Sequence, residues 1–429
     1  MRLYDRLLGF AERAMTDPAQ ADPGQTALPP RSAYPWFLTS SSLWLAGMSL
    51  QGFLFSWLLV GVLERPADEA GFARSLAEFP PLLVLFLGGL LGDRFNGRGY
   101  LATMHVLVAL PPLLIAAVYG LGELGYWWVV LFGVLMASIQ ALSDPARQSL
   151  INRVTRMDIQ RAVTIMIITS SLVGLSGFYL GGRLDDLGLG VVLSLQSLLF
   201  LAGTFAVLRL PSLPRVTHAG PPPGLAAGFR AVWQAPLVRN IISLNFLSSL
   251  FNAGAYVIAI PFIVKEVYEG GSAFFAGVMM VFSAGSIGSN VLLLAFMPLM
   301  RPGRVFLLMQ LTRVVILLLL ATQPSLWLFY ATMFAWGVNM GVTTTLVRTT
   351  VQELADPTRR SQVMSILLLS FMVTAPVSSV LLGLLIEYTS PLSALLPGVA
   401  MSLIIFSIGV WKSGLWQFQS GSAAAARSA

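Results

Sequence analysis

The sequence predicts an all-α membrane protein with twelve transmembrane helices, arranged as two pseudo-symmetric six-helix halves. Three observations predict it: an apolar composition, twelve long apolar segments and an internal repeat. Of the 429 residues, 56% are hydrophobic and 10% are charged, whereas soluble domains carry about 25% charged residues. The mean hydropathy of +0.77 agrees with helices that face lipid, because a bilayer admits only spans whose backbone groups are satisfied internally.

The twelve apolar segments are each long enough to cross a bilayer, which takes about 20 residues in a helix. Glycine, proline or charged residues separate them. We expect the spans at residues 36–63, 72–92, 99–120, 124–143, 161–182, 188–208, 238–262, 273–298, 304–322, 325–347, 361–386 and 389–411.

The longest polar connection is rich in proline and glycine and separates six spans from six. We therefore expect five parts: an N-terminal segment at 1–35, an N-terminal half at 36–209, a central loop at 210–237, a C-terminal half at 238–412 and a tail at 413–429.

An internal repeat supports this division, because marked residues recur at nearly constant offsets in corresponding spans. The matches at an offset of 201 are Trp44 with Asn245, Gln51 with Asn252 and Arg147 with Arg348; those at 202 are Gly181 with Gly383 and Asp185 with Glu387.

The distribution of basic residues orients the spans. We place both termini on one side of the membrane, together with the loops that lead from an even-numbered span to the next odd-numbered span. That side then holds 22 of the 26 Lys+Arg and 9 of the 19 Asp+Glu. The net charges are then 22 − 9 = +13 and 4 − 10 = −6, which sum to +7. Basic loops stay in the cytoplasm, so we expect the N-terminal segment, the central loop and the tail there. Nucleic-acid binding is not expected, because the arginines are scattered over short loops.

The stretch GGLLGDRFNGRGYL at 88–101 is a polar turn between spans 2 and 3. It resembles the signature loop of the major facilitator superfamily, which reads Gly, three residues, Asp, Arg, any residue, Gly and a basic cluster. The residues that fit are Gly89, Asp93, Arg94 and Arg98, whereas Asn96 replaces a glycine. The resemblance implies the major facilitator fold and alternating access. It also implies that Asp93 holds the cytoplasmic side shut against the N-terminus of span 11, where a carboxylate is favourable. The alternative is a solvated loop.

A second stretch, SDPARQSLINRVT at 143–155, resembles the branch that contains the enterobactin exporter and related drug-efflux and secretion-effector transporters. Asp144 and Arg147 lie three residues apart and are expected to pair on one helical face. Arg147 is a candidate partner in the cytoplasmic gate, and the alternative is an arginine that snorkels from a helix end.

Glycines in span 5 resemble the antiporter motif, which bends a helix and favours export. The matching residues are Gly177, Gly181 and Gly182, with Phe178 in place of the motif's proline. The alternative is simple close packing of helices, which glycines at this spacing permit.

Polar residues within the spans are candidates for a substrate cavity. Trp44 and Gln51 are seven residues apart and therefore share a helix face. By resemblance, spans 1, 4, 7, 8 and 10 face the cavity, and the further candidates are Gln140, Asn245, Asn252, Asn290 and Asn339. The alternative is that these amides bond to neighbouring helices. With the surrounding aromatic residues, such a cavity suits an amphipathic, poorly charged or large substrate.

Charged residues inside spans are costly and point to function. Glu78 in span 2 is the candidate for proton coupling, because a carboxyl group in an apolar setting holds its proton more readily than in water. Asp144 is the second choice. Arg313 and His105 lie in spans that are peripheral by resemblance, so snorkelling or structural pairing is expected for them.

The expected function is proton-coupled efflux of an amphipathic small molecule such as a drug or siderophore, by a monomer in a bacterial inner membrane. The small molecule, protons and the bilayer are its partners. Uptake or lysophospholipid transport is the alternative, and a non-transporting receptor is the alternative of another class. An enzyme, a metal site or a cofactor is not expected, because the sequence has no cysteine, two histidines and no nucleotide-binding loop.

Overall fold

The protein is described from a computed structural model, which covers residues 30, 32–87, 97–157, 159–211, 225–297 and 299–421. Within these ranges every regular element is helical. Ten of the described helices are long and apolar enough to cross a membrane. Helices α3 (Ala67–Leu87) and α14 (Leu326–Leu354) lie between them in chain order and bring the described spans to 10 + 2 = 12. The predicted fold class is confirmed.

The N-terminal half contains six spans and one short helix. They are α2 (Ala33–Trp57) with a π-helical continuation η2 (Leu58–Val62), α3, α4 (Gly97–Gly120), α5 (Tyr126–Val154), α6 (Ile159–Gly181), the short α7 (Leu184–Leu187) and α8 (Leu189–Leu208).

The C-terminal half also contains six spans. The first is a composite of α10 (Pro236–Gly254), η4 (Ala255–Ala259), α11 (Ile260–Phe262) and η5 (Ile263–Val267). The others are α12 (Ser272–Phe296), α13 (Pro302–Ala321), α14, α15 (Arg360–Tyr388) and α16 (Leu396–Trp411), which follows the 3₁₀ turn η6 (Ser393–Leu395).

Two helices differ from the expected spans for a physical reason. Helix α5 was expected to end near residue 143 but continues to Val154, because a helix can extend past the bilayer into water without losing its backbone hydrogen bonds. The stretch 143–154 is therefore helical. The central connection, expected as a loop, contains α9 (Leu225–Gln234). Gly228 of α9 lies so close to Gln362 and Ile366 of α15 that a Cβ atom would crowd both.

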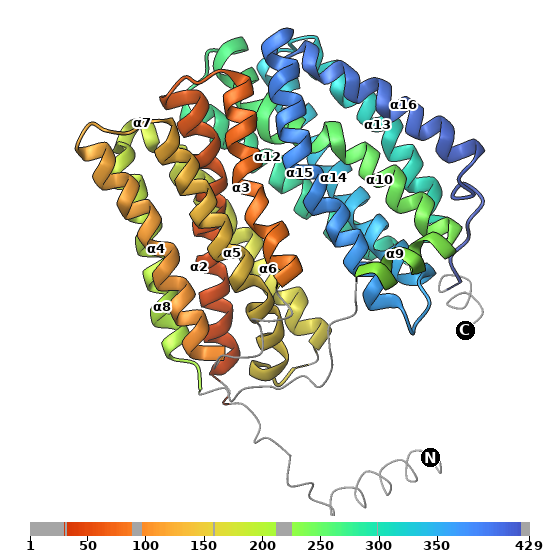
Figure 1. Ribbon diagram of the computed structural model, residues 1–429, viewed down its shortest axis with the longest axis horizontal. Coiled ribbons are helices and arrows are strands. Elements are labelled where there is room, and N and C mark those ends of the chain that lie inside the picture. The colour runs from red at the N-terminus through yellow and green to blue at the C-terminus, as the bar shows by residue number, and fades with distance from the viewer. Residues whose placement is uncertain are drawn as a thin grey trace, which may run out of the picture.

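The bundle has two distinct ends, which we call the α9 end and the opposite end (Figure 1). At the α9 end, Arg359 donates to Gln234 of α9. The turns that precede α3, α12 and α14 lie at the opposite end, where Tyr268 donates to the carbonyl of Pro324. The ribbons of the two halves lie closest at the opposite end and spread apart toward the α9 end (Figure 1).

Close packing within and between halves holds this arrangement. In the N-terminal half α2 packs against α6 and α8, and in the other half α12 packs against α14. Between the halves α3 packs against α15, with Gly71 of α3 so near the Ser379 carbonyl and Gly383 that no Cβ atom fits. The rings of Phe53 and Trp57 pack against Phe275 of the other half, at centroid distances of 5.0 and 5.4 Å.

Candidate functional site

A cavity of about 280 Å³ lies within the N-terminal half, between α2, α3 and α5. We call it the α2–α3–α5 cavity. Three residues singled out in the sequence line it, one from each helix: Gln51, Glu78 and Gln140. Each lies near the middle of its helix, so the cavity sits deep in the bundle. Most of the remaining wall is apolar, with Phe55 and two methionines among its residues.

An ion pair occupies one wall of this cavity. Nη2 of Arg74 lies 2.6 Å from Oε1 of Glu78, one helical turn away on α3. The two side chains are 22% and 28% exposed. The Arg74 guanidinium also lies 5.6 Å from the centroid of the Phe55 ring, a cation–π distance. Arg74 is not among the candidates predicted from sequence, although a basic residue four positions before an acid in one span indicates such a pair.

Arg74 keeps an unused donor. Its Nε is buried and has no hydrogen-bond partner among the described residues. Arg74 also lines a small void, together with Phe55, that Val257, Ile258 and Phe262 of the C-terminal half close from the other side. The guanidinium therefore lies where the α2–α3–α5 cavity meets the contact between the halves.

The orientation of Gln51 is set by Gln196, which is not among the candidates predicted from sequence. Nε2 of Gln196 on α8 donates to Oε1 of Gln51 at 3.1 Å and to the carbonyl of Gly47 at 3.1 Å. Gln196 is fully buried, so this contact ties α8 to α2 behind the cavity wall.

Trp44 lies in a buried aromatic cluster and is not among the residues that line the α2–α3–α5 cavity. Its ring contacts His105 of α4 and Phe200 of α8, at centroid distances of 4.8 and 5.6 Å. The guanidinium carbon of Arg147 lies 4.0 Å from its ring centroid. His105 in turn contacts the Ser40 hydroxyl at 3.2 Å and the carbonyl of Leu101 at 2.9 Å.

Arg147 is held by this cluster rather than by Asp144. It donates to the hydroxyl of Ser143 at 3.0 Å, and no ion pair joins it to Asp144 among the residues described. Both residues lie in the part of α5 nearest the α9 end. Arg98 lies there too, in the first turn of α4. Gly89, Asp93 and Arg94 lie outside the described residues.

In the C-terminal half, Asn252 and Asn290 bond to neighbouring helices. Asn252 accepts from Nε1 of Trp336 at 2.9 Å, and Asn290 accepts from Thr345 at 2.7 Å. Asn245 is buried, and its amide nitrogen has no partner in the described part of the chain.

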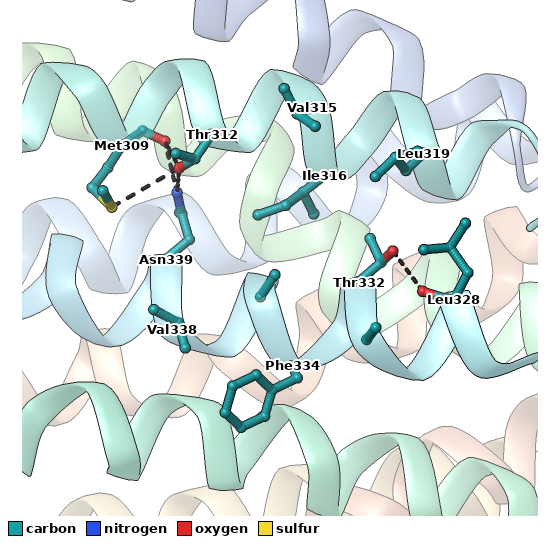
Figure 2. A pocket seen from close by; sticks show the side chains of 12 residues that line it. Met309, Thr312, Val315, Ile316, Leu319, Leu328, Thr332, Phe334, Val338 and Asn339 are labelled. Carbon is teal, nitrogen blue, oxygen red and sulfur yellow. Dashed lines mark hydrogen bonds between the residues drawn. The ribbon is translucent and has the colours of Figure 1, made fainter. Parts of the chain in front are cut away.

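Asn339 lies in a polar cluster around the buried guanidinium of Arg313. It accepts from Nη2 of Arg313 at 2.9 Å and donates to Thr312 at 2.7 Å and to the carbonyl of Met309 at 2.6 Å. Arg313 also donates to Ser248 and Gln310. Figure 2 shows Asn339 and Thr312 at one end of a groove of about 560 Å³ between α13 and α14, whose other residues are almost all apolar.

The glycines of α6 lie where helices approach closely. A Cβ atom at Gly177 would collide with the carbonyl oxygen of Ala46 on α2, and one at Gly181 with the Phe53 ring. A Cβ atom at Gly182 would lie 2.7 Å from Ala276 of the C-terminal half.

Two carboxylates join the halves at the opposite end. Oδ2 of Asp185 accepts from the backbone N–H of Ser272, the first residue of α12, at 2.9 Å. Oε2 of Glu387 accepts from the backbone N–H of Ala67, the first residue of α3, at 3.3 Å. Asp185 and Glu387 are partners in the internal repeat, so the same contact occurs twice.

A further ion pair joins the halves at this end. Nζ of Lys265 lies 3.1 Å from Oε1 of Glu64. Among the described residues, no group of three or more His, Cys, Asp or Glu side chains is placed to bind a metal ion.

The comparisons with known proteins agree with this architecture. A family model described as Major Facilitator Superfamily matches residues 36–378. The comparison with curated proteins found no match.

Solved structures with the same fold include the nucleoside transporter NupG, at 14% identity and a TM-score of 0.73 over 90% of this chain and 99% of that one. A D-xylose-proton symporter matches at 13% identity and a TM-score of 0.68 over 89% and 97%. A bacterial homologue of the human lysosomal transporter Spinster, inward-facing and occupied, matches at 13% and 0.69 over 89% and 97%. At these identities the likeness shows the fold alone.

Proposed function

Because the chain belongs to the major facilitator superfamily, we propose that it is a secondary active transporter that exports an amphipathic small molecule, such as a drug or siderophore, in exchange for protons. Transport proceeds by alternating access, in which the two halves rock about a site near the middle of the membrane. The protein acts as a monomer in a bacterial inner membrane, with both termini in the cytoplasm.

The ion pair in the α2–α3–α5 cavity is the observation that carries the proposal. Charged side chains inside a bilayer are expensive and mark pathways or proton relays, and Arg74 and Glu78 are two such side chains on one wall of a cavity. A proton on Glu78 removes its charge and weakens the pair; loss of that proton restores it. The pair therefore gives the cavity two charge states, which proton coupling requires.

The contacts between the halves favour the loading state of an exporter. They close the opposite end through Asp185, Glu387 and Lys265. With the α9 end in the cytoplasm, as the positive-inside rule expects, the closed end is the outer one, and an exporter takes up its substrate while that end is closed.

The outward-facing state, in which an exporter releases its substrate, needs a gate that closes the α9 end. We assign that gate to Gly89, Asp93 and Arg94, which lie outside the described residues, together with Arg98, Asp144 and Arg147, which lie near the α9 end. Arg147 makes a cation–π contact with the Trp44 ring at this end of the bundle. This contact holds its side chain in place for a role in the gate.

A flux measurement tests the function. Purified protein in proteoliposomes with an imposed pH gradient is given a panel of lipophilic dyes that includes cationic, zwitterionic and anionic members. Gradient-driven movement of at least one dye is expected, and Glu78→Gln should abolish it because glutamine cannot exchange a proton. Glu123→Gln, the same change at an exposed turn, should transport normally.

Two results would contradict the proposal. Flux that survives in Glu78→Gln would remove the coupling role of Glu78. A dye that binds the protein but never crosses the membrane would indicate a receptor on this fold.

A further inference from the structure

The charges that line the α2–α3–α5 cavity cancel. Its titratable residues in the described chain are one arginine and one glutamate, and the other polar side chains, among them Gln51 and Gln140, are neutral. Arg74 and Glu78 contact each other through one nitrogen and one oxygen, Nη2 and Oε1. Each group has a further polar atom outside this contact: Nη1 on Arg74 and the second carboxylate oxygen, Oε2, on Glu78.

A ligand with a single charge fits this wall poorly. An anion that binds Arg74 repels Glu78, and a cation that binds Glu78 repels Arg74. Either ligand adds a net charge to a partly buried wall whose own charges cancel, which is unfavourable in a medium of low polarity.

We propose that the α2–α3–α5 cavity binds a zwitterionic amphipath, whose anionic group contacts Arg74 and whose cationic group contacts the free oxygen of Glu78. Such a ligand satisfies both groups and leaves the ion pair intact. Its apolar body lies on the Phe55 and methionine side of the cavity. This inference rests on the proposed transport function and adds the substrate class.

The inference is consistent with exchange for protons. The ligand's cationic group needs a charged Glu78, so the ligand and a proton on Glu78 exclude each other. A site that holds either the proton or the substrate gives antiport. An anionic substrate would instead favour symport. By displacing Glu78 from Arg74 it would favour proton uptake by Glu78, so that substrate and proton move in the same direction.

Three dyes with the same ring system test the charge preference. Rhodamine B is a zwitterion at neutral pH, its ethyl ester is a cation and fluorescein is an anion. Binding to the full-length protein is measured by fluorescence polarisation in a neutral maltoside detergent. Rhodamine B should bind about tenfold more tightly than either of the other two.

Variants should change the preference in opposite directions. Arg74→Gln leaves Glu78 alone and should shift the preference toward the ethyl ester, whereas Glu78→Gln should shift it toward fluorescein. Arg74→Gln/Glu78→Gln should bind the three dyes about equally. Arg230→Gln, on the exposed side of α9, is the control and should keep the wild-type order. Size-exclusion profiles and thermal unfolding establish that each variant is folded.

The outcomes separate the two proposals. Equal binding of rhodamine B and its ester, or an order that the variants leave unchanged, overturns the zwitterion site even if another dye is transported. Rhodamine B bound with the expected order but never moved supports the site and contradicts the transport function. If none of the three dyes binds, the zwitterion site is overturned. Flux of another dye would then still support the transport function.

Discussion

At the scale of single residues, the chain places polar groups in the bilayer in two ways. Arg74 and Glu78 line a cavity and neutralise each other. Arg313 is buried, with 3% exposure, and donates to neutral oxygens of three helices. In the second case the cation has no counter-ion among the described residues, so its hydrogen-bond acceptors must compensate the loss of water.

The Arg313 cluster leads to a stability prediction. Asn339→Ala removes an acceptor from a buried cation and should lower the unfolding free energy by about 1–3 kcal/mol. The matched control is Asn290→Ala, which removes an exposed amide and its bond to Thr345 and should cost less. Thermal unfolding in detergent compares the two, and equal losses would show that the cluster adds no special stability.

At the scale of elements, glycine decides how closely α6 approaches α2. Gly177 lies against the carbonyl of Ala46 and Gly181 against Phe53, so this face of α6 contacts the backbone of its neighbour directly. The antiporter-like sequence of this helix therefore coincides with a packing contact. Its predicted role in export stays a prediction.

Substitution of one glycine tests the packing. Gly177→Ala places a methyl group against backbone atoms that cannot turn aside, and we expect a loss of about 1–3 kcal/mol in unfolding free energy. Gly190→Ala, in α8, meets nothing within 4 Å and should be neutral or gain up to about 1 kcal/mol from helix propensity. A Gly177→Ala protein as stable as wild type would mean that α6 shifts without cost.

At the scale of the whole molecule, the internal repeat appears as a pair of contacts between the halves. Asp185 caps α12 and Glu387 caps α3, and a carboxylate at a helix N-terminus is favourable by about 0.3–2 kcal/mol. Both contacts join the halves at the opposite end. In the proposed rocking motion they would break as that end opens, so they would bias the balance between the two states.

Removal of both carboxylates should open the opposite end more often. The chain has no cysteine, so Ala137→Cys places a single thiol in the α2–α3–α5 cavity. In Asp185→Asn/Glu387→Gln this thiol should react several-fold faster with an impermeant maleimide added from the outer side. A loss of about 1 kcal/mol in the free energy that favours the closed opposite end implies a change of this size. Asp186→Asn, which breaks an exposed pair with Arg183 inside one half, is the control. An unchanged rate in the double variant would exclude the two caps as a gate.

The sequence by itself determined the class of this protein, its twelve spans, its repeat and its family. These follow from the length of apolar segments and the local motif at 88–101, which are properties of consecutive residues, and from the constant offsets of the repeat. Glu78 was also selected from sequence, because a charge inside an apolar segment is conspicuous wherever the helix points.

Only the tertiary structure decided which polar residues meet. Gln51 and Asn339 look alike as single amides in apolar spans, yet one lines a cavity and the other bonds to Arg313 on the next helix. The partner of Asp185 is 87 residues away, and that of Glu387 is 320 residues away. The direction in which a side chain points depends on the rotation and crossing of packed helices, which the contacts of the whole bundle set and which no local pattern of residues encodes.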